Sequence, residues 1–177
     1  YQEAVHAEVR TIVDHIPPKD LAIQWDCATE LMDGYGALDG FDPETAIERN
    51  VAQFEAVCPD IPETAWLGFH LCFGTLGGWP RFSPDDLSGA VKMANAFIKR
   101  SGRRVDWVHI PVLNRDDDAF FAPLAHLRPA GTKIHLGMVH NMDGFRKRLA
   151  TARKYLPEFG LGAFCGFGRE APEKLPE

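Results

Sequence analysis

The chain lacks the features that would place it at a membrane or on a nucleic acid. None of its apolar runs approaches the roughly 20 residues of a membrane-spanning helix. Acidic residues outnumber basic residues by 25 to 19, which gives a net charge of −6 and an isoelectric point near 5.6. This balance disfavours binding to nucleic acid or to an anionic membrane surface. The sequence therefore predicts a protein with neither kind of partner.

Disulfide and nucleotide-binding patterns are also missing. The chain has only four cysteines, and their wide spacing does not indicate a disulfide framework. Reduced cysteines fit the cytoplasm, which is the expected location. A glycine-rich loop at residues 74–80 has neither the Walker lysine nor the Gly-x-Gly-x-x-Gly spacing. With 45% hydrophobic residues in 177, the chain is long enough for one domain with a sizeable core.

Apolar runs alternate with amphipathic stretches along the whole chain. Strands are predicted at residues 21–26, 66–74, 104–113, 133–140 and 161–165. Helices are predicted at residues 1–16, 42–58, 83–100, 116–127 and 143–156, the fourth interrupted near Pro123. Residues 33–43 are predicted to form a loop. Apolar strands that alternate with helices are typical of a parallel sheet covered by helices.

Chemically active side chains gather at the carboxyl ends of the predicted strands, and this favours a barrel over a doubly wound sheet. They are Asp26, His70, Cys72, His140 and Cys165. A (β/α)8 TIM barrel places its functional residues at these ends, whereas a doubly wound sheet binds dinucleotides at a glycine fingerprint.

A complete barrel has eight strands in about 250 residues. We therefore expect residues 1–177 to be the C-terminal part of a barrel, about its last five β/α units. The two unpaired edges of such a sheet would bind either the rest of a longer chain or a second copy of this one.

A His-x-Cys pair closes the second predicted strand. Alternation along a strand points His70 and Cys72 to the same face, with backbones roughly 6.6 Å apart. Imidazole and thiolate are preferred ligands of Zn²⁺. Cys165, at the end of the last strand, is the natural third ligand. The alternative is a hydrogen-bonded core histidine with small, buried cysteines.

Five motifs, in order and spacing, resemble the second half of the catalytic barrel of cobalamin-independent methionine synthases. They are Gln24-Trp25-Asp26, Phe69-His70-Leu71-Cys72, Val105 to Ile110, Leu136 to Val139, and Phe164 to Arg169. The resemblance spans nearly the whole chain and implies that His70, Cys72 and Cys165 bind zinc. In that family the zinc activates the thiol of homocysteine, which takes a methyl group from a methylated folate. The chain would then be a 5-methyltetrahydropteroyltriglutamate–homocysteine S-methyltransferase-like enzyme, with a thiol and a methyl donor as its small-molecule partners.

The sequence departs from the family at two points. Pro111 stands where the family has a fourth zinc ligand, a glutamate, and His109, two residues earlier on the same face, is a candidate substitute. The family's acidic pair at the end of an early strand reads Asp26-Cys27 here, with Glu30 the nearest later acid. The resemblance therefore implies Asp26 and Glu30 as substrate-binding residues and a zinc site with three protein ligands.

Two other functions remain open at this stage. One is a metal-free barrel enzyme of the uroporphyrinogen decarboxylase type, which would need arginines at the mouth to hold an anionic substrate. The other is a non-catalytic half-barrel that binds a small molecule or another chain. Arg169 is a candidate either for holding an anionic group or for the surface. His135 and His140 are predicted to lie on opposite faces of their strand.

Overall fold

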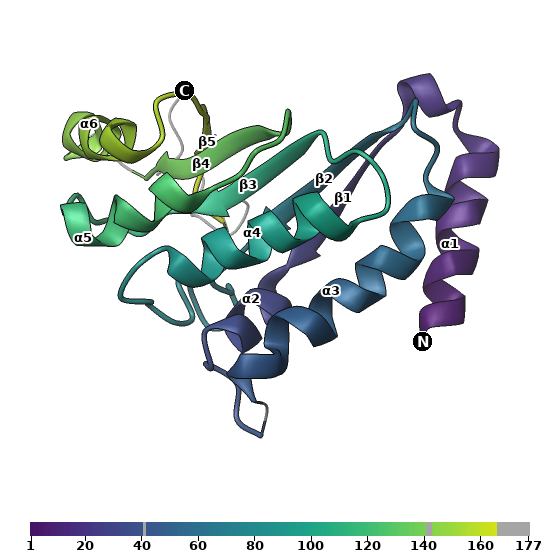
Figure 1. Ribbon diagram of the computed structural model, residues 1–177, viewed down its shortest axis with the longest axis horizontal. Helices are drawn as coiled ribbons and strands as arrows, with labels where there is room; N and C mark the ends of the chain where they lie inside the picture. The colour runs from purple at the N-terminus through teal and green to yellow at the C-terminus, as the bar shows by residue number, and fades with distance from the viewer. Residues whose placement is uncertain (41, 141–142, 166–177) are drawn as a thin grey trace.

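The computed structural model describes residues 1–40, 42–140 and 143–165. Its centre is a sheet of five parallel strands whose spatial order follows the sequence, β1-β2-β3-β4-β5 (Figure 1). The strands are β1 (Ala22–Cys27), β2 (Trp66–Leu71), β3 (Trp107–Pro111), β4 (Lys133–Val139) and β5 (Gly160–Ala163). The prediction of a parallel α/β fold is confirmed. Within the described residues, β1 and β5 each pair on one side only.

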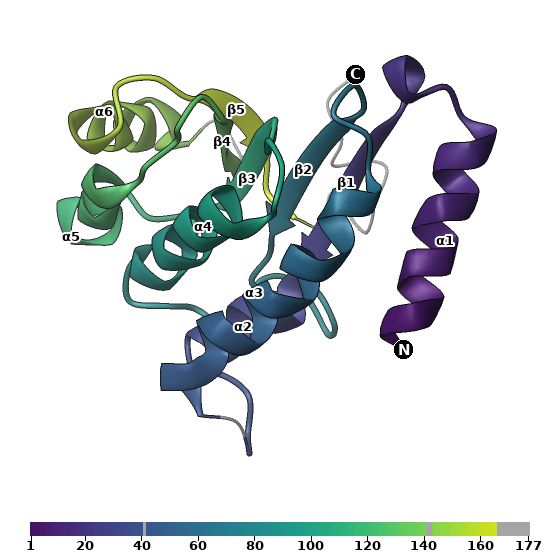
Figure 2. The same ribbon diagram turned by 45° about the vertical axis from the view of Figure 1, so that its right-hand side comes forward.

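The helices, of which α1 precedes β1 and the others follow the strands, lie along one face of this sheet. They are α1 (Gln2–His15), α2 (Ala28–Gly34), α3 (Ala46–Val57), α4 (Ser88–Arg100), α5 (Asp118–Phe121) and α6 (Phe145–Tyr155). Helices α3 and α4 cross the front of the strands, and α1 stands beyond α3 at the β1 edge (Figures 1 and 2). Parallel neighbours that follow one another in sequence need crossovers of one hand, which places their helices on a single side. In the described part of the chain, no helix is both long enough and apolar enough to cross a bilayer.

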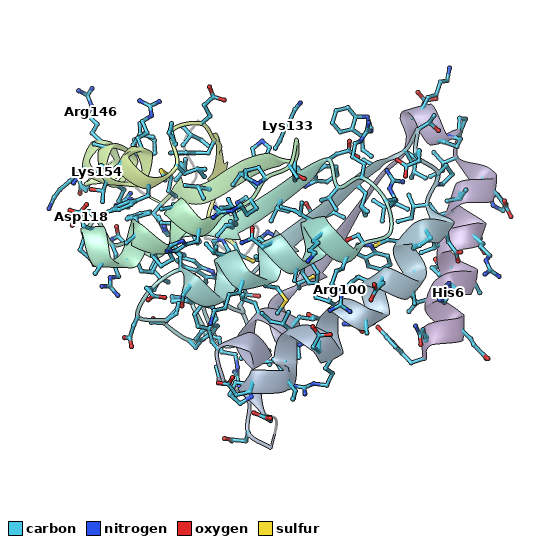
Figure 3. All side chains as sticks on the ribbon, viewed as in Figure 1. His6, Arg100, Asp118, Lys133, Arg146 and Lys154 are labelled. Atoms are coloured by element: carbon cyan, nitrogen blue, oxygen red, sulfur yellow. The ribbon has the colours of Figure 1, made fainter. Side chains whose placement is uncertain are left out.

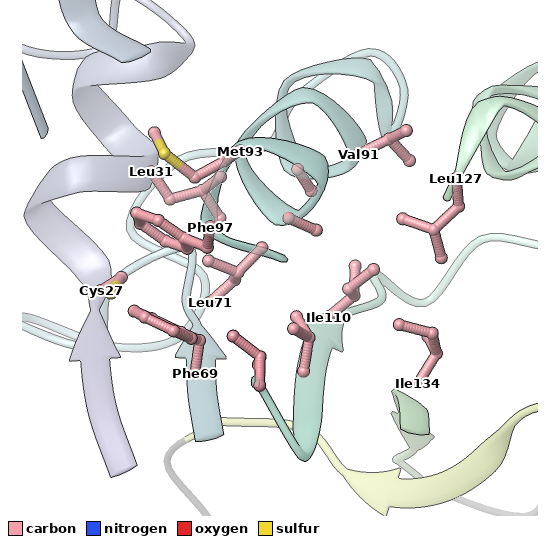
Figure 4. Close-up of a cluster of buried hydrophobic side chains, with 14 of the residues drawn as sticks. Cys27, Leu31, Phe69, Leu71, Val91, Met93, Phe97, Ile110, Leu127 and Ile134 are labelled. Carbon is pink, nitrogen blue, oxygen red and sulfur yellow. The ribbon is translucent and has the colours of Figure 1, made fainter. Parts of the chain in front are cut away.

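The core fills the space between the strands and these helices (Figure 4). Every second strand residue points toward the helices, because side chains alternate along a strand. These helix-facing residues are almost fully buried: Leu67, Phe69, Leu71, Val108, Ile110, Ile134 and Leu136. Phe97 of α4 stacks on Phe69 at a centroid distance of 4.4 Å, and both rings meet Phe54 of α3 edge-on. The aromatic contacts fix the two central helices on the sheet.

The opposite face of the sheet, called the polar face below, carries a row of polar side chains together with the rings of Trp66 and Trp107. The strand register aligns Asp26, His70, His109, His135 and Gly160 in one row across all five strands. Asp26 is exposed and the three histidines are partly exposed, in contrast to the buried residues on the helix side. The two faces therefore differ in chemistry as well as in packing.

Glycines on this polar face make room for rings that lie across the neighbouring strand. The Trp107 ring lies where a side chain on Gly68 would point, and the His135 ring does the same over Gly160. A Cβ on Gly137 or Gly162 would come within 2.7 Å of His109. The glycines that interrupt the apolar strands thus set the positions of the rings.

The charged side chains of Arg100, Asp118 and Lys154 lie on the outside of the helices (Figure 3). Lys154 of α6 pairs with Asp118 of α5 at 2.9 Å, and Arg100 of α4 reaches Glu48 of α3 at 2.7 Å. Exposed pairs of this kind contribute about 0–1 kcal/mol each. The burial on the inner side of the helices, rather than these pairs, therefore stabilises the fold.

The predicted strands and helices are present, although β2, β3 and α3 are shorter than the predicted 66–74, 104–113 and 42–58, and three further differences stand out. Residues 28–34 form α2, a short helix that the sequence pattern did not indicate. Helix α4 begins at Ser88 rather than at residue 83, since the preceding residues form an irregular segment. The predicted helix at residues 116–127 is the short α5 followed by a 3-10 helix, η4 (Ala122–His126). The expected interruption near Pro123 is present, because proline lacks the N–H that an α-helix needs there.

Candidate metal centre

Three side chains with metal-binding donors meet at the carboxyl end of the sheet. The ligand atoms of His70, Cys72 and Cys165 all lie within 4.8 Å of one another. His70 is the penultimate residue of β2, Cys72 follows that strand directly, and Cys165 comes two residues after β5. Strands β2 and β5 are separated by β3 and β4, so the two segments meet only because the chain curves toward the polar face. The structure thus brings together the three residues that the sequence suggested as ligands.

This set of one imidazole and two thiols suits Zn²⁺. Zinc sites with three protein ligands leave the fourth position for water or substrate. Burial and the adjacent Cys165 raise the pKa of the Cys72 thiol, and the backbone N–H of Gly74, which lies 3.3 Å from Sγ, opposes this shift. A buried thiol of this kind stays protonated at neutral pH unless a cation stabilises its thiolate. The residues present therefore fit a divalent metal with affinity for sulfur.

His70 is hydrogen-bonded to a second histidine on the next strand. Its Nδ1 lies 2.8 Å from Nδ1 of His109, and the two rings stack at a centroid distance of 4.8 Å. Burial and the neighbouring His70 lower the pKa of His109 to about 4, and burial also lowers the pKa of His70, against the attraction of Asp26. Both imidazoles are thus neutral at pH 7, as a metal ligand requires.

His109 lies beside the metal-binding group rather than within it. Pro111, at the position of the missing fourth ligand, is buried at the end of β3 and pairs with Gly137 of β4. It offers no donor to a metal. The described residues thus provide three donor atoms at this site, and one of the three residues, His70, is hydrogen-bonded to His109.

The two predicted substrate-binding acids lie at the β1 edge. Asp26 is the register partner of His70 and accepts a hydrogen bond of 2.9 Å from Gln24. Glu30, on α2, is within 3.4 Å of the Gln53 amide. Both acids line a hollow of about 330 Å3 between β1, α1 and α3. Asp26 thus stands between this hollow and the metal-binding group.

An aromatic cluster that the sequence did not reveal packs next to Cys165. Phe164 stacks on His140 at 5.0 Å with nearly parallel rings, and Trp79 contacts both rings. His140 Nε2 donates a hydrogen bond of 2.6 Å to the carbonyl of Val112. The cluster joins the segments that follow β2, β3, β4 and β5, so it holds the residue before Cys165 in place. No local pattern signals it, because its members are far apart in sequence.

His135 and His140 have different environments. His135 lies in the polar row beside His109, whereas His140 follows the end of the strand and packs into the cluster. Arg169, the candidate for an anionic group, lies outside the described residues.

Comparison with known proteins finds a likeness in fold. No protein-family model and no curated protein matches the chain. A crystal structure from Listeria monocytogenes, provisionally assigned as a vitamin-B12-independent methionine synthase, is similar with a TM-score of 0.61 and 20% sequence identity. The match covers 96% of this chain and 48% of the Listeria chain. The two proteins share a fold over that region, and the present chain spans about half the length of its structural neighbour.

Proposed function

We propose that the chain is the metal-binding part of a zinc-dependent methyltransferase of the methionine synthase type. The methyl group would pass from a methylated folate-type donor to a thiol such as homocysteine. The observation that carries the proposal is the convergence of His70, Cys72 and Cys165 on the polar face of a parallel sheet. The similarity in fold to the Listeria protein agrees with it. Residues 1–177 would form the C-terminal part of a (β/α)8 barrel.

The chain's own residues suggest how a thiol would be activated. Zinc held by the three donors would supply the positive charge that stabilises a thiolate near neutral pH. Cys72 and Cys165 would lose their protons on binding, and His70 would use the lone pair of one nitrogen. The side chain of Asp26, the register partner of His70, would attract the ammonium group of an amino-acid thiol. The substrate would be the nucleophile, so no residue is needed as a general base.

Metal analysis tests this proposal directly. Protein prepared without chelator should contain about one zinc ion per chain, and Cys72→Ser or Cys165→Ser should lose it. Cys58→Ser is the matched control, because Cys58 is a fully buried cysteine outside the metal-binding group. Zinc-loaded protein should also methylate homocysteine in the presence of a methylated folate.

Two results would refute the proposal in different ways. Protein without any metal would refute the zinc site and favour a metal-free barrel enzyme. Bound zinc without methyl transfer, even with the remaining strands supplied, would favour a non-catalytic binding module.

A further inference from the structure

We propose that Gly74 is a positioning residue of the metal centre, whose backbone N–H holds the sulfur of Cys72 in place. This inference rests on the proposed function, because it assumes that His70, Cys72 and Cys165 bind a metal. Gly74 lies three residues beyond the end of β2 and has no side chain to offer as a ligand. It would act on the metal only through the sulfur that it contacts.

The hydrogen bond between Gly74 and Cys72 has only one possible direction. The backbone N of Gly74 lies 3.3 Å from Sγ of Cys72. A backbone N–H can only donate, so the sulfur is the acceptor. A thiolate keeps lone pairs after it binds a metal, so the same bond can form in the metal-bound protein.

The bond matters because the sheet does not hold Cys72. The described pairing of β2 ends at Leu71 on the β1 side and at His70 on the β3 side. Cys72 is the next residue, and its sulfur must lie near the donor atoms of His70 and Cys165 to share a metal with them. The N–H of Gly74 therefore fixes a ligand at the point where strand pairing stops.

The peptide unit that supplies this N–H is held from its other side as well. Its carbonyl belongs to Phe73 and accepts a hydrogen bond of 3.1 Å from the backbone N–H of Arg81. The N–H and C=O groups of a trans peptide lie in one plane and point in opposite directions. The bond from Arg81 therefore sets the direction of the N–H toward Cys72.

Only glycine fits at this position. The φ angle of Gly74 is +78°, in the left-handed region that residues with a Cβ rarely adopt. The surrounding space is also filled, because an added Cβ would lie 3.0 Å from Cβ of Arg81 and 3.1 Å from Sδ of Met32. A larger residue at position 74 would therefore turn the N–H away from the sulfur.

The sharpest test removes this N–H and changes little else. Cell-free translation with glycolic acid at position 74 replaces the amide N–H by an ester oxygen, which cannot donate. The same replacement at Gly77 is the matched control, because Gly77 lies in the same loop with a φ of +83°. Gly74→Ala and Gly77→Ala form a second pair, since a Cβ at Gly77 would meet no atom of the described residues within 4 Å.

Metal binding provides two readouts. By competition with a chelator, we expect zinc affinity to be about 10- to 100-fold weaker in the position-74 ester and in Gly74→Ala, and within a few-fold of the wild type in both changes at Gly77. In cobalt-loaded protein, the thiolate-to-cobalt charge-transfer band should move to longer wavelength in the position-74 ester alone among the two esters. A sulfur that loses a hydrogen bond gives up electron density more readily, whereas a general loss of stability would not move the band.

The outcomes separate this inference from the proposed function. A position-74 ester with wild-type zinc affinity, or one with weaker affinity and an unmoved cobalt band, would overturn the inference while leaving the metal centre in place. A wild type that binds neither zinc nor cobalt would refute the metal centre itself, and the inference with it.

Discussion

Replacing Gly162 by alanine should disturb the metal centre through a residue that never touches the metal. The new methyl group would lie 2.7 Å from Nε2 and 2.9 Å from Cδ2 of His109. Optimal contacts between carbon atoms are about 3.5–4.0 Å, so the ring must move by roughly 1 Å. This movement would stretch the hydrogen bond between Nδ1 of His109 and Nδ1 of His70. We expect zinc affinity to fall about 10- to 100-fold, equivalent to about 1.4–2.7 kcal/mol.

The matched control is Gly160→Ala in the same strand. Its methyl group would meet the ring of His135, with 2.6 Å to Nε2 and a still closer approach to Cδ2, so its clash is at least as severe as the clash at Gly162. Overpacking should lower the free energy of unfolding of both variants by about 1–3 kcal/mol. Only Gly162→Ala should lose zinc affinity in a chelator competition assay. Equal affinities in the two variants would show that the position of His109 does not matter for metal binding, and would refute the reasoning.

Three further predictions concern stability and association. Phe97→Ala should lower the free energy of unfolding by about 3–5 kcal/mol in urea denaturation, because the ring is fully buried against Phe69. A loss below about 1 kcal/mol would contradict this packing. Burial lowers the pKa of His140, against the effect of its hydrogen bond to Val112, so the unfolded chain binds the proton more readily than the folded chain. The free energy of unfolding should therefore fall as the pH drops below about 6.5. His140→Gln should reduce the slope of this fall in pH-dependent denaturation, and an unchanged slope would refute the prediction. The half-exposed Leu161 lies on β5, which pairs only with β4 among the described residues, and it should promote self-association. Leu161→Lys should reduce this association in sedimentation velocity experiments, and a wild type that stays monomeric at high concentration would rule it out.

Much of the fold could be predicted because it depends on short-range patterns. Apolar runs such as residues 66–71 form buried strands, and the stripe of apolar residues at 46–57 forms a helix. Because the carboxyl ends of parallel strands lie at one edge of the sheet, the donors of distant segments were expected to be close together. That rule places Cys165 and His70 at the same edge of the sheet, but it does not give the distance between their ligand atoms.

The rest could not be predicted because it depends on how neighbouring strands pack. Strand alternation placed His109 on the same face as Pro111, but its hydrogen bond to His70 depends on the glycines at 137 and 162, which leave room for the ring. The helix α2 is only seven residues long, so its periodicity was too short to recognise. The aromatic cluster around Phe164 combines segments from three distant parts of the chain.

The difference between the two faces of the sheet is the main argument for a barrel. Helices cover both faces of a doubly wound sheet, and its strands are apolar on both sides. Here the helix side carries fully buried residues such as Phe69 and Ile110, whereas the other side carries Asp26, His70 and His109. A barrel turns this second face inward and forms its active site at the carboxyl ends of the strands. The donor atoms meet on this same face, so the proposed metal centre and the proposed barrel depend on the same asymmetry.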